Sequence, residues 1–87
     1  MTLRIVAEVR EGWTTIRLIG RMRAEHIEPV REEIAASRMP TALDLDEVTL
    51  ADIDAVHFLV AVERDGIVLQ HCAPFIREWM ARESGAS

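Results

Sequence analysis

One stretch, residues 43–62, changes its hydrophobic period halfway along, and this change constrains the fold more than any other feature. In its first part apolar residues alternate with acids, which indicates a strand over residues 41–45 that ends in Asp46 and Glu47. In its second part the apolar residues recur every three or four positions, which places them on one face of a helix. A buried strand that leads through an acidic turn into a buried helix is typical of α/β domains.

The acids that follow this turn have an ordinary structural role. Asp52 stands where a helix N-cap belongs, and Thr49 three residues earlier gives a weak capping-box pattern. Asp54 falls in the first turn of the helix, where the positive end of the helix dipole stabilises a negative charge by about 0.3–1 kcal/mol. We therefore interpret both aspartates first as residues that start the helix.

The segment before this stretch predicts a hairpin. Residues 3–9 and 13–19 each have the alternation of a strand, and Glu11-Gly12 between them supplies the turn. Gly20 is expected to end the second strand.

Two amphipathic helices and a further strand complete the chain. The first helix covers residues 24–37, although Pro29 is tolerated only within a first turn, which favours a true start nearer Glu28 than Ala24. After the polar stop at residues 63–66, a short apolar strand covers residues 67–72, and Pro74 opens the last helix. Residues 83–87 are expected to form a frayed tail.

The expected order is strand, strand, helix, strand, helix, strand, helix. Strand-helix-strand steps with short connections favour right-handed crossovers between parallel strands. The sequence therefore predicts a single α/β domain over residues 1–87, with a four-stranded mixed sheet whose first strand is antiparallel and whose other strands are mainly parallel. Three helices should cover this sheet.

The charge balance restricts the class of partner. Fifteen acids against ten bases give a net charge of −5, which argues against nucleic acids and anionic membranes, because both require a basic face. A single cysteine cannot form an internal disulfide, so we expect a reducing cytoplasmic location. We find no signal peptide and no apolar run long enough to insert into a membrane.

The chain resembles the STAS domain family, which is found in anti-sigma-factor antagonists and sulfate transporters. The resemblance depends on the order of the elements, on Gly20 after the second strand, on residues 43–56, and on residues 66–69 followed by Pro74. Family members usually continue into one more strand and helix, which this sequence lacks.

The family pattern at the helix start reads Asp-Ser-Ser-Gly-Leu. Asp52 matches the family aspartate, Ile53 replaces the first serine, and Asp54 replaces the second serine, which is the phosphorylated one in the family. Ala55 replaces the glycine, and Val56 keeps the apolar position. The serine switch is therefore expected to be lost, because a serine kinase cannot phosphorylate aspartate, whose single charge is smaller than the roughly −1.5 to −2 of a phosphate.

The resemblance implies a bacterial, non-enzymatic signalling module that regulates transcription by docking on a protein partner, such as an anti-sigma kinase-like protein. We expect no cofactor. The surface that would dock comprises Asp46, Glu47, Thr49, Asp52, Ile53, Asp54 and His57. Two interpretations of Asp54 stay open: it fixes the surface in a phosphorylated-like state, or it is an acid that merely suits the helix dipole, which we favour.

Other functions fit the sequence less well. STAS-like proteins also serve as accessory subunits of membrane transport ATPases. Asp44 and Asp46 after an apolar strand are similar to the nucleophile motif of metal-dependent phosphotransfer enzymes, but the chain contains no lysine to complete such a site. The histidines and Cys72 lack the spacing that preorganises a zinc site, and Cys72 is expected to be a small core residue.

The last strand also predicts an interaction surface. Because the family's final strand is missing, residues 67–72 are expected to form an open sheet edge, and apolar open edges pair with other chains. We therefore predict a homodimer or a partner complex through Ile67 and Leu69 or through the helix that carries Trp79. Phe75 and Trp79 themselves are expected to be mainly core.

Overall fold

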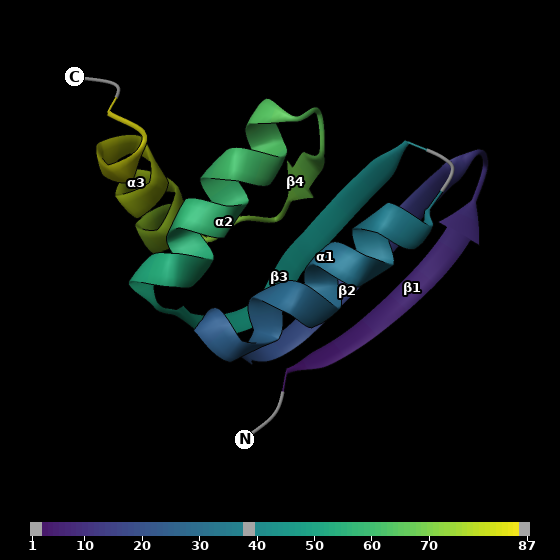
Figure 1. Ribbon diagram of the computed structural model, residues 1–87, viewed down its shortest axis with the longest axis horizontal. Coiled ribbons are helices and arrows are strands. Elements are labelled where there is room, and N and C mark those ends of the chain that lie inside the picture. Colours follow the sequence, from purple (N-terminus) through teal and green to yellow (C-terminus); the bar gives the residue numbers. More distant parts are fainter. Residues whose placement is uncertain (1–2, 38–39, 86–87) are drawn as a thin grey trace.

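A computed structural model describes residues 3–37 and 40–85 of the chain (Figure 1). The elements follow one another as β1 (Arg4–Arg10), β2 (Trp13–Met22), a 3₁₀ turn η1 (Ala24–His26), α1 (Ile27–Ala36), β3 (Thr41–Ala51), α2 (Ile53–Arg64), β4 (Val68–Gln70) and α3 (Pro74–Glu83). This order confirms the predicted succession of four strands and three helices.

The four strands form one mixed sheet in the order β1-β2-β3-β4. β1 is antiparallel to β2, and β2, β3 and β4 run parallel. These strand directions were predicted. The hairpin turn is formed by Glu11 and Gly12, whose φ angles of 54° and 81° are the left-handed pair that a tight hairpin requires.

The helices lie on one face of the sheet, with α1 and α2 in front of the strands and α3 beside α2 (Figure 1). The core between helices and sheet consists of fully buried apolar side chains, the largest of which are Ile16, Leu18, Met22, Val30, Leu43, Leu45, Val56, Leu59 and Ile76. In the described residues no helix covers the opposite face, which we call the open face; on β2 it carries Trp13, Thr15, Arg17 and Ile19.

The prediction of a short strand over residues 41–45 followed by an acidic turn was wrong. The strand does not end at Leu45 but runs to Ala51, so Asp46 and Glu47 lie within it. Its pairing with β2 is interrupted twice, because one extra residue of β3 is inserted before Glu47 and another before Leu50. Each such bulge reverses the alternation of side chains. Two neighbouring residues of β3 are therefore exposed at each bulge. In the sequence, this pair of polar or exposed positions has the same pattern as a turn that follows a strand.

Smaller corrections concern the ends of other elements. Gly20 does not end β2, which continues to Met22, because Gly20 adopts a φ of 116° within the strand, next to the second bulge. β1 lies one residue later than predicted, and β4 is shorter than the predicted strand. The first predicted helix begins as the 3₁₀ turn η1, and regular α-helix starts at Ile27, close to the start near Glu28 that Pro29 favoured.

The last helix differs from expectation at both ends. Phe75 is not core, because 49% of its surface is exposed, whereas Trp79 is partly buried against the core. Glu83 belongs to α3 and not to a frayed tail. Residues 86–87 of that predicted tail lie outside the described residues.

Candidate functional site

The junction between β3 and α2 is organised by Asp52, which is the N-cap of α2 as predicted. Its Oδ1 accepts the backbone N–H of Ala55 at 2.9 Å. Its Oδ2 accepts the backbone N–H of Ala24 at 2.9 Å, which attaches η1 to the start of α2. Both carboxylate oxygens are therefore occupied by the protein's own backbone, and Asp52 is a structural residue that shapes the junction.

Five exposed side chains flank Asp52 along the end of β3 and the start of α2, and we call them the junction surface: Thr49, Leu50, Ile53, Asp54 and His57. Leu50 and Ile53 are 44% and 40% exposed, although both are large and apolar. Asp54 lies in the first turn of α2 and makes no hydrogen bond or ion pair with the residues that the structure describes.

Two members of the junction surface make contacts within the fold. The Thr49 hydroxyl donates to the carbonyl oxygen of Gly20 at 3.3 Å. His57 Nε2 lies 2.7 Å from Glu83 Oε1, which connects α2 to α3. Leu50 was not among the predicted site residues, because only the second bulge of β3 brings it to the surface.

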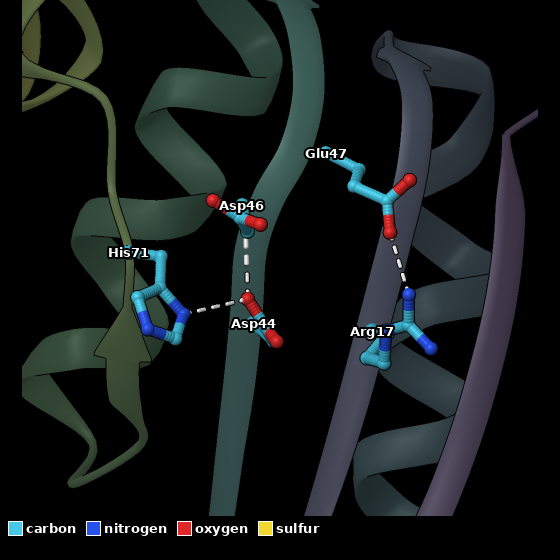
Figure 2. A network of polar contacts seen from close by, with 5 residues as sticks. All are labelled: Arg17, Asp44, Asp46, Glu47 and His71. Atoms are coloured by element: carbon cyan, nitrogen blue, oxygen red, sulfur yellow. Dashed lines mark hydrogen bonds and ion pairs between the residues drawn. The ribbon is translucent and has the colours of Figure 1, made fainter.

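Asp46 and Glu47 do not belong to the junction surface. They lie in a polar network on the open face together with Arg17, Asp44 and His71 (Figure 2). Glu47 forms an ion pair with Arg17 of β2. Asp44 Oδ1 accepts the Asp46 backbone N–H at 3.0 Å and lies 3.0 Å from His71 Nδ1.

The Asp44–His71 pair perturbs the titration of both groups. Burial tends to raise the pKa of Asp44, but the hydrogen bonds from His71 and from the Asp46 amide outweigh it and hold this pKa below its ordinary value. The hydrogen bond to Asp44 and the negative charge of Asp44 raise the pKa of His71. The pair therefore favours a charged carboxylate beside a charged imidazole.

The candidates for metal or nucleophilic chemistry do not assemble into a reaction centre in the described part of the chain. No three histidine, cysteine or acidic side chains come together there as metal ligands. Burial raises the pKa of the Cys72 thiol, which disfavours the reactive thiolate. His26 is buried, and its Nδ1 accepts the Arg23 backbone N–H at 3.1 Å, so its role is structural.

β4 lies at the edge of the sheet, as predicted. Ile67, Leu69 and Trp79, however, are partly buried against the core. The apolar side chain that β4 exposes is Val68, at 43%. The homodimer through this edge stays a prediction.

The sequence matches no protein-family model and no curated protein, whereas the fold is similar to that of solved structures. The anti-sigma factor antagonist SpoIIAA, in its unphosphorylated form, superposes with a TM-score of 0.67 at 17% identity, over 88% of this chain and 79% of that one. A protein from Shewanella loihica of the DUF3478 family, with a SpoIIAA-like fold, gives 0.53 at 15% identity, over 97% and 77% of the two chains.

A third structure, named Mglu, gives a TM-score of 0.61 at 18% identity over 75% of this chain, but only 18% of the other. The fold is therefore STAS-like, as the sequence predicted. No helix in the described residues is both long and apolar enough to cross a bilayer.

Proposed function

We propose that this STAS-like chain is a non-enzymatic module that binds a protein partner through the junction surface. The observation that carries the proposal is the exposure of Leu50 and Ile53, near Asp54, which has no partner among the residues that the structure describes. Exposed apolar side chains with a polar rim are typical of interaction sites. The likeness to an anti-sigma factor antagonist supports a regulatory role.

The charge of the chain defines the chemistry of this partner. A net charge of −5 and the acid at position 54 favour a partner whose contact surface is basic around an apolar centre. We propose an anti-sigma kinase-like protein in the cytoplasm. Asp46 and Glu47, which belong to the polar network, contribute to steering this partner and not to the central contact.

A pair of matched variants tests the site. Ile53→Asp places a charge within the junction surface, whereas Phe75→Asp changes an apolar residue of comparable exposure at the start of α3. We expect affinity purification from the native host to recover the same partner with wild type and Phe75→Asp but not with Ile53→Asp. Equal recovery with both variants would contradict the proposal. Recovery of a transport ATPase would instead support the accessory-subunit alternative.

Asp54 requires its own test, since it stands where the resemblance places the phosphorylated serine. We propose that it is an acid suited to the helix dipole, so that Asp54→Ser restores neither phosphorylation nor stronger partner binding. Both phosphorylation and binding are measured with the recovered partner and ATP. If Asp54→Ser gained phosphorylation or bound the partner more strongly, the phosphorylated-like interpretation would be favoured. Asp54→Asn, which cannot be phosphorylated but also removes the charge, is the control.

A further inference from the structure

The open face contains a pocket that the proposed function does not use. It has a volume of about 420 Å³ and is lined by Arg10, Glu11, Trp13, Thr15, Val68 and Gln70. Thr15 and Val68 both pair with Ala42 near the start of β3. α2 begins beyond Ala51, nine residues further along β3, which is roughly 30 Å at the rise of an extended strand. The pocket and the junction surface are therefore separate sites.

The strand register explains why this pocket has apolar walls. Thr15, Ala42 and Val68 lie in one row across β2, β3 and β4. The central residue of the row carries only a methyl group, so no bulky side chain separates the Trp13 side of the pocket from Val68. Trp13 and Val68 are each 43% exposed. An indole plane and a branched aliphatic group thus form the two surfaces against which a flat ring would pack.

The polar groups of the pocket are available for a ligand. Within the described residues, the side chains of Arg10, Glu11 and Gln70 make no hydrogen bond or ion pair, and the Trp13 indole N–H has no acceptor. Arg10 pairs in register with Trp13, and Glu11 follows it in the hairpin turn. A guanidinium and a carboxylate, not paired with each other, therefore both line the pocket that Trp13 borders.

We propose that this pocket binds a free aromatic α-amino acid. The ring would pack between Trp13 and Val68, the ligand carboxylate would bind the Arg10 guanidinium, and its ammonium group would bind the Glu11 carboxylate. A zwitterion is complementary to both rim charges, whereas a simple anion or cation is repelled by one of them. A volume of about 420 Å³ lies within the range of small-molecule sites.

The fluorescence of Trp13 provides the test. Trp79→Phe leaves Trp13 as the single tryptophan, and the full chain with this change is titrated with L-phenylalanine, 3-phenylpropanoate and 2-phenylethylamine. We expect saturable quenching by phenylalanine, with a Kd about tenfold lower than for either analogue, because each analogue lacks one charged contact. Absence of saturation, or equal Kd values for the three compounds, would overturn the proposal.

Two arginine variants of β1 locate the carboxylate contact. Arg10→Gln should raise the Kd of phenylalanine about tenfold and leave that of 2-phenylethylamine unchanged or lower. Arg4→Gln removes an arginine from the same strand, where it pairs with Ile19 away from the pocket, and should change neither value. Equal effects of the two variants would refute the assigned site, and matching circular dichroism spectra would establish that both variants fold.

Discussion

Asp52 is the residue on which the geometry of the β3–α2 junction depends, because it accepts hydrogen bonds from Ala55 and Ala24. Asp52→Ala leaves both backbone N–H groups without this acceptor. We expect the free energy of unfolding to fall by about 1–2 kcal/mol, in the upper part of the range for N-cap removal. Urea denaturation followed by circular dichroism measures this change.

Asp54 is the matched control for Asp52, since it is an acid of the same helix turn without a partner in the described residues. Asp54→Ala removes only the interaction with the helix dipole, about 0.3–1 kcal/mol at most. If Asp54→Ala lowered the free energy of unfolding more than Asp52→Ala did, the two hydrogen bonds of Asp52 would not be what stabilises the junction.

The Asp44–His71 pair should make stability depend on pH in two opposite ways. Because the pKa of His71 is raised, the contribution of His71 to the stability of the fold is complete below pH 6.5, the ordinary pKa of histidine. This contribution is lost as the pH rises through the pKa of the folded state. The lowered pKa of Asp44 means that its contribution is complete above the ordinary value of 3.8 and is lost as the pH falls through the folded-state pKa. The pair thus stabilises the fold most between pH 3.8 and 6.5.

An NMR titration of the His71 ring measures this coupling directly. We expect Asp44→Asn to lower the pKa of His71 towards 6.5, because it removes both the charged hydrogen-bond acceptor and its charge. Asp46→Asn removes a more distant charge and should lower this pKa less. An unchanged pKa of His71 in Asp44→Asn would show that the two side chains do not interact in solution.

At the scale of elements, Gly20 allows β2 to continue past the second bulge of β3. Its φ of 116° is one that residues with a side chain rarely adopt. Gly20→Ala should therefore lower the free energy of unfolding by more than about 1 kcal/mol. Arg21→Ala, at the next exposed position of the same strand, should change it by less than about 0.5 kcal/mol. Denaturant unfolding distinguishes the two, and equal small effects would mean that the strand accommodates the side chain.

The bulges also explain which features the sequence predicted and which it did not. The order of strands and helices followed from hydrophobic periodicity, and the Asp52 cap followed from local chemistry. Asp46 and Glu47 were assigned to a turn, because a bulge interrupts alternation in the same way that a strand end does. His71 and Asp44 are 27 residues apart, and their contact depends on the pairing of β4 with β3, which periodicity does not determine.

At the scale of the whole molecule, the three helices on one face leave the other face of the sheet without a covering helix in the described chain, and β1 and β4 form the two edges (Figure 1). The junction surface and the open-face pocket lie near opposite ends of β3. The two proposed sites are therefore far enough apart that occupation of one would leave the other accessible.

Self-association is the property of the whole molecule that the edge strand β4 predicts. Pairing of two β4 strands would join two sheets, but the strand has only three residues and each copy carries a net charge of −5. We expect a weak dimer whose fraction rises with protein concentration and with salt, because salt screens the repulsion between the copies. Sedimentation equilibrium at low and high salt measures this fraction.

Two lysine substitutions determine which edge of the sheet forms the dimer. Val68→Lys places a charge on β4 and should abolish the dimer, because charged side chains prevent edge-to-edge pairing. Val9→Lys places the same charge at an exposed position of β1, the opposite edge strand, and should leave the dimer intact. If Val9→Lys alone abolished the dimer, β1 would be the associating edge. If the wild-type chain stayed monomeric at all concentrations and salt levels, β4 would be an edge that its short length already protects.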